Sequence, residues 1–129
     1  ILTFRLKRLK NIISRRSNNV KLYKKLISSK KVKIIETKEN FIDAHVMFIT
    51  LCDNRDELQK YLLKNNIQSL VYYKTPLHLH KATKFLGYKK GDFPVAEKLT
   101  KQVLSFPHHQ HLTKKEINQV ANKINSFYK

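Results

Sequence analysis

The chain has 129 residues, of which 41% are hydrophobic and 28% charged, so it is long enough for one domain with a real core. No apolar run approaches the roughly 20 residues that a membrane span needs, and the start, Ile1–Arg5, lacks the pattern of a signal peptide because its basic residue follows the apolar ones. The single cysteine, Cys52, excludes an internal disulfide framework and favours a buried thiol in a reducing, cytoplasmic setting.

The formal net charge of +18 has two explanations. A charge this high suggests nucleic acid or another anionic surface as a partner. However, the basic residues are mostly lysines, they are scattered along the chain, and they occur with many Asn and Ile residues. That mixture is typical of AT-rich codon usage, which adds lysine without selecting for binding. We favour this compositional explanation and keep the polyanion partner as an alternative.

The first half of the chain predicts a long helix followed by strands. Apolar residues recur at three- and four-residue spacing over residues 2–29, which indicates a helix. Val32–Glu36 is predicted to be a short strand. His45–Leu51 is an apolar run of branched and aromatic types, which predicts a buried strand.

A crossover helix is predicted next. Asp53 or Asn54 is placed to cap it, and acidic residues in its first turn suit the helix dipole. Asn65-Asn66 predicts its end, because asparagine tolerates the left-handed conformation. Ile67–Tyr73 then predicts a further strand.

The last third predicts three helices and one extended segment. Pro76 begins a short helix, Leu77–Phe85, and a longer helix is expected over Phe93–Leu104. Ser105-Phe106-Pro107 is expected to be extended. Thr113 and Glu116 match a capping box that begins the final helix. Its predicted core stripe consists of Ile117, Val120, Ala121, Ile124 and Phe127. The sequence therefore predicts an α+β fold, in which a small, mostly antiparallel sheet is covered by helices and led by one long helix.

Five of the six histidines lie between Val71 and Thr113 and raise the question of a metal site. The two clusters are His78 with His80, and His108-His109 with His111. Histidine is a common metal ligand, but neither cluster has a recognised zinc spacing. We therefore predict no metal site and no catalytic residue within the chain.

Tyr72, Tyr73 and His78 form the strongest candidate binding group. Strand side chains alternate, so the two tyrosines are expected on opposite faces at the end of a strand. The turn at Pro76 then brings His78 back towards that end. An aromatic ring beside an imidazole can stack on a base or sugar and bind a phosphate. The simpler alternative is that Tyr73 packs and His78 completes the turn.

The order of motifs along the chain resembles the DegT/StrS family, the aminotransferases that depend on pyridoxal phosphate (PLP) and act on nucleotide-linked keto sugars. The matching residues are Arg55-Asp56-Glu57-Leu58, Ile67, Tyr73, Pro76-Leu77-His78, Gly87-Tyr88, Gly91-Asp92-Phe93-Pro94-Val95-Ala96-Glu97, Leu104-Ser105-Phe106-Pro107, and Leu112-Thr113 with Glu116-Ile117. The resemblance implies the small C-terminal domain of a fold-type I aminotransferase. Residues 1–30 would be the helix that links the two domains of the enzyme, and residues 31–129 the α+β small domain.

The chain departs from the family pattern at three positions. Asn66 replaces a glycine, Lys74 replaces a proline, and Tyr72 stands where relatives often have histidine. The resemblance places these changes beside the sugar nucleotide. It also places the PLP lysine and its acidic partner in a large N-terminal domain, so this chain alone is expected to bind no PLP and to be inactive.

For the intact enzyme, the resemblance implies amino transfer from glutamate to a keto sugar by a homodimer, in surface polysaccharide or amino-sugar biosynthesis. Tyr72, Tyr73 and His78 would face the sugar nucleotide. Nucleic acid and membrane are not expected as partners. The alternatives are a basic RNA- or polyanion-binding module and a catalytically dead scaffold derived from the family.

Overall fold

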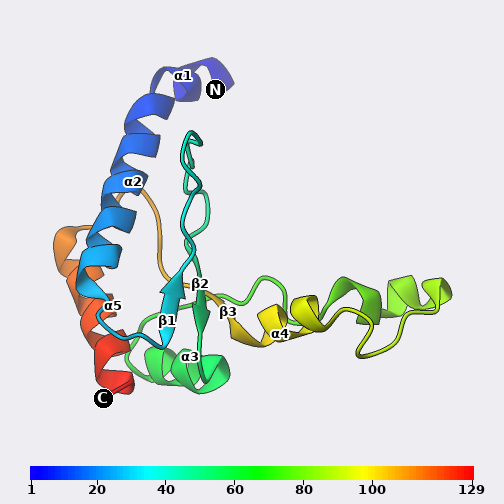
Figure 1. Ribbon diagram of the computed structural model, residues 1–129. Helices are drawn as coiled ribbons and strands as arrows, with labels where there is room; N and C mark the ends of the chain where they lie inside the picture. The colour runs from blue at the N-terminus through cyan, green and yellow to red at the C-terminus, as the bar shows by residue number, and fades with distance from the viewer.

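Three short strands form one antiparallel sheet in the computed structural model, which describes residues 1–129. The strands are β1 (Val32–Ile34), β2 (Ile49–Cys52) and β3 (Val103–Ser105), in the spatial order β1-β2-β3. Lys33 pairs with Leu51, and Thr50 pairs with Leu104. The small antiparallel sheet with helices around it confirms the predicted fold class (Figure 1).

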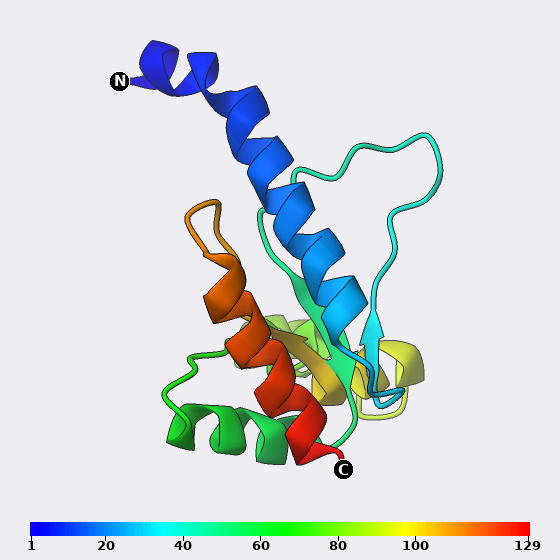
Figure 2. The ribbon, with the colours of Figure 1, turned by 90° about the vertical axis from the view of Figure 1, so that its left-hand side faces the viewer.

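The other regular elements are helices, and only some of them pack against the sheet. They are α1 (Leu2–Lys7), α2 (Leu9–Leu26), α3 (Arg55–Lys64), α4 (Pro94–Gln102) and α5 (Lys114–Phe127), with two 3-10 helices, η1 (Leu77–Leu79) and η2 (Lys81–Leu86). Figure 2 shows α2 and α5 side by side across one face of the sheet, with α3 below them. None of the helices has both the length and the apolar character required to cross a lipid bilayer.

The hydrophobic core lies between the sheet and helices α2, α3 and α5. It consists of Val20, Tyr23, Val32, Phe48, Cys52, Leu58, Leu62, Ile67, Leu104, Phe106, Ile117, Val120 and Ile124. The Tyr23 ring stacks on Phe48, with ring centroids 4.9 Å apart, and its hydroxyl donates to the Pro107 carbonyl at 2.9 Å. Cys52 is fully buried, and burial raises the pKa of its thiol to about 11. The predicted burial of this thiol is thus confirmed.

The long N-terminal helix forms, but it is broken at Arg8 and ends at Leu26 rather than near residue 29. Its end is fixed by a residue from the other end of the chain. The Asn125 side chain donates to the Leu26 carbonyl at 2.8 Å and accepts from the Ser28 amide at 3.0 Å. This cap comes from α5, so the local sequence gives no sign of it.

The strand predicted over Ile67–Tyr73 is wrong. The segment makes a single β-bridge, in which Leu70 and Ser105 exchange backbone hydrogen bonds of 2.9 and 2.8 Å. The third strand is instead Val103–Ser105, which was predicted as a helix end followed by an extended segment. The strand predicted over His45–Leu51 begins only at Ile49, because His45 has a left-handed φ of 47° and the chain bends there.

Residues 72–102, hereafter the arm, leave the sheet and project sideways, with α4 at the root and η1 and η2 towards the tip (Figure 1). The α-helix predicted over Leu77–Phe85 is replaced by two 3-10 turns. The Thr83 hydroxyl lies 2.6 Å from the Leu77 carbonyl and 3.0 Å from the His80 carbonyl, so it competes with the backbone for these acceptors.

The final helix matches its prediction. The Thr113 hydroxyl accepts from the Glu116 amide, and the Glu116 side chain accepts from the Thr113 amide at 2.7 Å, so the capping box is confirmed. The crossover helix α3 ends as predicted, since Asn66 has a left-handed φ of 58°. At its start, Asn54 also takes a left-handed φ, and its side chain does not cap the helix.

Candidate functional site

Tyr72 and Tyr73 lie at the root of the arm, immediately after the bridge that joins Leu70 to Ser105. Both side chains are exposed. Although this segment is not a regular strand, the two tyrosines line different cavities, one on each side of the root. Two neighbouring phenol groups thus each line a separate cavity.

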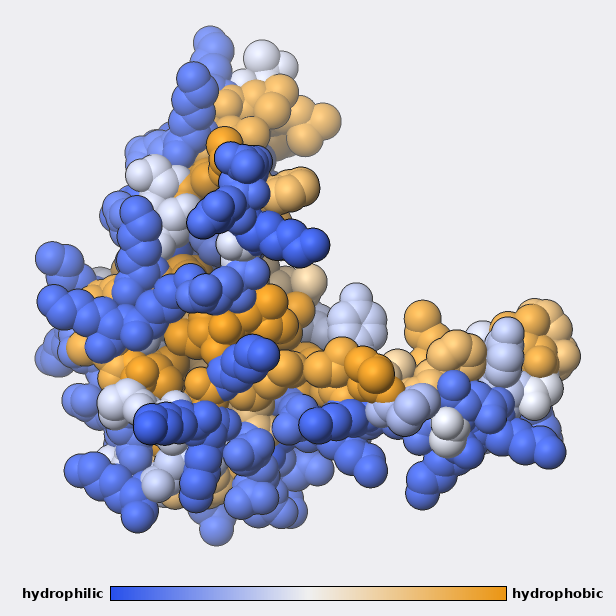
Figure 3. Space-filling view, in the orientation of Figure 1, coloured by the Kyte–Doolittle hydropathy of each residue, from blue (hydrophilic) through white to orange (hydrophobic).

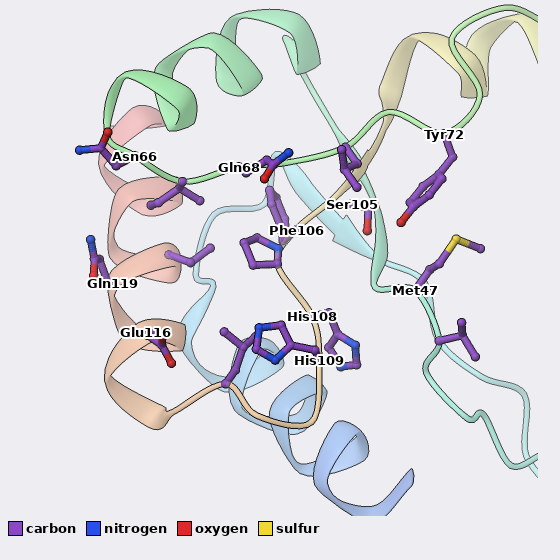
Figure 4. Close-up of a pocket in the computed structure, with 16 residues that line it drawn as sticks. Met47, Asn66, Gln68, Tyr72, Ser105, Phe106, His108, His109, Glu116 and Gln119 are labelled. Atoms are coloured by element: carbon purple, nitrogen blue, oxygen red, sulfur yellow. The ribbon is translucent and has the colours of Figure 1, made fainter. Parts of the chain in front are cut away.

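The first cavity, of about 520 Å³, lies between the root of the arm and α5. Tyr72 and Met47 stand at one side of it, and Glu116 and Gln119 of α5 stand at the other (Figure 4). Its remaining wall includes Ile67, Leu70, Phe106, Pro107, Leu112 and Val120, together with the polar residues Asn66, Gln68, His108 and His109. An apolar surface with several convergent polar groups is typical of a site for a small organic molecule.

His108 is the most buried histidine of this first cavity. Its Nε2 donates to the Arg16 carbonyl at 3.2 Å, and its Nδ1 is buried without a hydrogen-bond partner. Burial lowers the pKa of His108. The hydrogen bond to the Arg16 carbonyl opposes this shift, and the charges of His45, Arg16 and His109 reinforce it. The lowered pKa favours the neutral form of the ring, in which Nε2 donates and Nδ1 is left as an acceptor.

The second cavity, of about 480 Å³, is almost entirely apolar and lies between the root of the arm and α4. Tyr73 and His78 line it together with Pro76, Leu77, Phe93, Leu99 and Val103. The structure therefore brings Tyr73 and His78 together, but it places Tyr72 on the other side of the chain. The three residues share one region and not one cavity.

His78 faces inward rather than towards solvent. Only 8% of its side chain is exposed, its Nε2 lies 3.1 Å from a carboxylate oxygen of Glu97, and its ring packs 4.8 Å from Phe93. The same Glu97 oxygen accepts from the Gly91 amide at 2.7 Å, and this hydrogen bond, with the contribution of His78, lowers the pKa of Glu97. His78 and Glu97 together hold η1 against the start of α4.

Arg55 is a structural residue of this region whose role the sequence did not reveal. It is 5% exposed, and its guanidinium donates to the carbonyls of Val103 and Thr100 at 2.8 and 3.1 Å. These carbonyls lie at the end of α4, where a positive charge is favourable. Arg55 is the first residue of α3, where a positive charge interacts unfavourably with the helix dipole. An arginine at this position was therefore the one indication in the sequence that its side chain has another role.

The histidines of each cluster form hydrogen bonds with different protein groups and do not converge on one point. His80 Nε2 lies 3.1 Å from the Thr75 carbonyl, while His78 pairs with Glu97. In the second cluster, the His109 Nδ1 accepts from the His111 amide. No three metal-ligating side chains converge on one point anywhere in residues 1–129.

Comparisons with known proteins give a consistent result. A sequence model described as the DegT/DnrJ/EryC1/StrS aminotransferase family matches residues 1–125. The erythromycin biosynthesis sensory transduction protein EryC1 of Saccharopolyspora erythraea is 43% identical over 74 residues, which are 57% of this chain and 20% of EryC1. A dTDP-3-amino-3,4,6-trideoxy-alpha-D-glucose transaminase of Streptomyces venezuelae is 32% identical over 78 residues, which are 60% of this chain and 21% of the transaminase.

A solved structure extends this similarity to the whole chain. The crystal structure of DesV from S. venezuelae superposes with a TM-score of 0.92 at 27% identity, covering 98% of this chain and 34% of DesV. The chain therefore spans about a third of this solved relative, and its matches cover about a fifth of the curated relatives.

The two cavities at the root of the arm lack the group that would anchor PLP covalently. PLP enzymes of this type hold the cofactor as a Schiff base on a lysine. No lysine lines either cavity at the root of the arm, and nearly every lysine of the chain is exposed on the surface. The two cavities supply aromatic, imidazole and amide groups instead, which can bind a ligand but cannot anchor the cofactor.

Proposed function

Because this chain belongs to the DegT/DnrJ/EryC1/StrS aminotransferase family, we propose that it is the C-terminal domain of a PLP-dependent aminotransferase that acts on a nucleotide-linked keto sugar. The observation that carries the proposal is the family match over residues 1–125, nearly the whole chain. The names of the relatives support the substrate class, since one of them is a transaminase of a dTDP-linked sugar. Such an enzyme would serve surface polysaccharide or amino-sugar biosynthesis.

We assign the parts of the active site to the two domains from the residues that this chain contains. The Schiff-base lysine and its acidic partner would belong to a large domain outside residues 1–129, joined through α1 and α2. PLP would supply the electron sink for amino transfer. This chain would supply the substrate side of the cleft and would bind no PLP by itself. Glutamate as the amino donor, a homodimer and a cytoplasmic location complete the proposal.

Tyr72, Tyr73 and His78 are the proposed contacts with the sugar nucleotide. The exposed rings of Tyr72 and Tyr73 are free to stack on a base or sugar, and their hydroxyls are free to donate to a phosphate or a sugar oxygen. His78 has its Nε2 at Glu97. Its contribution would be to hold the Pro76 turn, and with it Tyr73, in place.

The polyanion-binding module is a second candidate, and one observation favours it. Helices α1 and α2 carry basic residues and no acidic ones, and the first acidic residue of the chain is Glu36. A helix of this kind can follow a phosphate backbone. A catalytically dead scaffold of the same fold is the third candidate, and it differs from the first by having no sugar-nucleotide affinity.

Backbone amide NMR of the 129-residue chain, titrated with dTDP-glucose, separates these candidates. The first proposal predicts shift changes around Tyr72 and Tyr73 and along the lining of the first cavity. Changes confined to α1 and α2 that disappear with added salt would establish the polyanion module. No change at millimolar dTDP-glucose would leave the scaffold, and would overturn the proposed function.

Single hydroxyl deletions sharpen the titration. Tyr72→Phe and Tyr73→Phe each retain the ring, and loss of one hydrogen bond should weaken dTDP-glucose binding by about three- to tenfold. Tyr88→Phe is the matched control, because Tyr88 is also an exposed tyrosine of the arm but lines neither cavity. Equal affinity in all three variants would remove Tyr72 and Tyr73 from the site.

A further inference from the structure

Residues 35–47, hereafter the upper segment, follow β1 and contain no helix or strand. The segment rises beside α2 (Figures 1 and 2), and cavities of about 430 and 340 Å³ lie between the two. Figure 3 shows this part of the molecule as a narrow column that carries both apolar and hydrophilic side chains on its surface. Phe41, Ile42 and Val46 are among the exposed apolar residues. Because so few of its side chains are buried, the upper segment is expected to be among the least stable parts of the fold.

Two contacts tie the upper segment to the rest of the chain. Near its start, Glu36 pairs with Lys24 of α2 at 3.4 Å, and both side chains are exposed, so this ion pair is weak. Near its end, the ring of His45 meets that of His108 edge to face, with centroids 6.2 Å apart. Asp43 fixes His45 in its left-handed turn, since its carboxylate accepts from the His45 amide at 2.6 Å and lies 3.1 Å from His45 Nδ1. The contact between the two imidazoles is therefore the better shielded of the two ties.

His108 belongs to the body of the fold. Its ring packs against the core residue Phe48, with centroids 5.8 Å apart, and its Nε2 lies 3.2 Å from the Arg16 carbonyl of α2. Its Nδ1 is buried and has no partner. This arrangement satisfies the neutral ring, which needs only one acceptor for its single N–H. A second proton, at Nδ1, would create a buried N–H group without an acceptor, which is costly.

The charged groups around His108 oppose that second proton. Arg16 of α2, His45 of the upper segment and His109 of the same loop all carry or can carry positive charge. Glu116 of α5 lines the first cavity with His108, but its carboxylate is engaged by the cap of its own helix. No carboxylate forms an ion pair with His108, whereas His45 has one. A positive charge on His108 would therefore add to a group of basic residues without a counter-charge.

We propose that His45 and His108 form an acid-sensitive latch that keeps the upper segment in place beside the first cavity. Val46 and Met47 directly follow His45, and both line that cavity, as does His108. When His108 takes up a proton at Nδ1, the charged ring turns towards water and leaves His45. The upper segment then moves away, and the wall formed by Val46 and Met47 opens. This inference goes beyond the proposed function, since it does not depend on which ligand the cavity binds.

The direction of the pH dependence follows from the environment of His108. Burial lowers the pKa of this ring in the closed form, whereas a ring turned to water titrates near the ordinary value of about 6.5. The closed form is thus favoured in full above about pH 6.5, and this preference is lost as the pH falls from there to the lowered value. Over that range the ratio of open to closed chains should rise about tenfold per pH unit, because opening takes up one proton.

NMR titration of the isotope-labelled chain between about pH 8 and pH 5 tests the latch. Met47 is the single methionine, so its methyl group gives one signal from the cavity wall. His108 should titrate below the exposed His80, and the Met47 signal should shift with the midpoint of His108. One pH unit below that midpoint, the ring-to-ring NOE between His45 and His108 should be about tenfold weaker. An NOE that persists, a Met47 signal that does not respond, or α5 amides that lose their dispersion at the same midpoint would overturn the proposal.

Two variants and a control assign the effect to the latch. His108→Gln keeps an N–H donor for the Arg16 carbonyl but cannot titrate, so the Met47 signal should lose its pH dependence. His45→Gln removes the partner ring and its charge, so His108 should titrate at a higher pH and the Met47 signal at neutral pH should resemble that of the acid form. His80→Gln, in the arm, should behave like the native chain. A native response of Met47 in His108→Gln or His45→Gln would refute the latch, and if His108→Gln does not fold, His45→Gln and the native titration still decide.

Discussion

Arg55 is the single residue on which the arm depends most directly. Its guanidinium joins the start of α3 to the last carbonyls of α4, at Val103 and Thr100, and it is shielded from water. A buried guanidinium with two carbonyl partners is worth more than a surface ion pair, because its loss leaves two partly buried acceptors without this donor. The arm is thus rooted in the helix that covers the sheet.

Replacing Arg55 with glutamine should lower the free energy of unfolding by about 2–4 kcal/mol, since the shorter side chain reaches neither carbonyl. Urea denaturation followed by circular dichroism measures the change. Asp56→Asn is the control, because Asp56 pairs with Arg55 from the exposed side and should cost about 1 kcal/mol or less. Similar losses in the two variants would mean that the ion pair, and not the pair of carbonyls, carries the stabilisation.

The sequence was sufficient to predict the alternation of neighbouring side chains, but not the contacts between residues that are distant along the arm. The expectation that Tyr72 and Tyr73 face opposite sides used only the alternation of side chains along an extended chain, and in the structure the two tyrosines line different cavities. The contact of His78 with Glu97 joins residues 19 positions apart, and it forms only because the arm folds back on itself. No local pattern announces such a contact.

Among the elements, those with local determinants were predicted and those with remote partners were missed. The capping box of α5 and the asparagine that ends α3 are fixed by residues within a few positions of each other. The assignment of strands failed at Ile67–Tyr73, because the apolar character of this segment serves one bridge and the cavity wall rather than a ladder. Apolar runs of this length do not reveal which partner strand is available.

The capping box gives a prediction for α5. Thr113→Ala removes the hydroxyl that satisfies the Glu116 amide, so the free energy of unfolding should fall by about 0.5–2 kcal/mol. Thr113→Ser keeps the hydroxyl and should retain most of the stability. Thermal or urea unfolding of the three chains measures the difference. A serine variant as unstable as the alanine variant would show that the threonine methyl group, and not the cap, matters.

The same cap should depend on pH. Hydrogen bonds from the Thr113 amide and hydroxyl lower the pKa of Glu116 in the folded chain. A lowered folded-state pKa means that the stabilisation is complete above the ordinary glutamate pKa and is lost as pH falls through the lowered value. Glu116→Gln should therefore be less stable than the native chain at neutral pH, and the difference should shrink with acidification. A difference that does not change with pH would contradict this origin.

For the whole molecule, the composition limited the fold but not its shape. A real core was foreseeable from length and apolar content, and the sheet with α2, α3 and α5 forms it. The projecting arm was not foreseeable, because no local pattern in residues 72–102 indicates that this segment leaves the sheet. The excess of twenty-seven basic residues over nine acidic ones also had two explanations in the sequence, a polyanion partner and a compositional bias. In the folded chain, the excess of basic residues is expected to produce repulsion between positive charges.

A net charge of +18 on one small domain destabilises the folded state, because folding brings like charges closer together. Sodium chloride shortens the Debye length from about 30 Å at 0.01 M to about 8 Å at 0.15 M, so the melting temperature of the chain should rise over this range. General screening predicts that sodium sulfate at equal ionic strength gives a similar rise.

A polyanion site on α2 predicts instead a saturable, much larger stabilisation by heparin at low concentration, which added salt reverses. Melting curves followed at the helical circular dichroism band decide between the two. Screening alone would agree with the aminotransferase domain, whose lysines then reflect composition, and saturable stabilisation would contradict it.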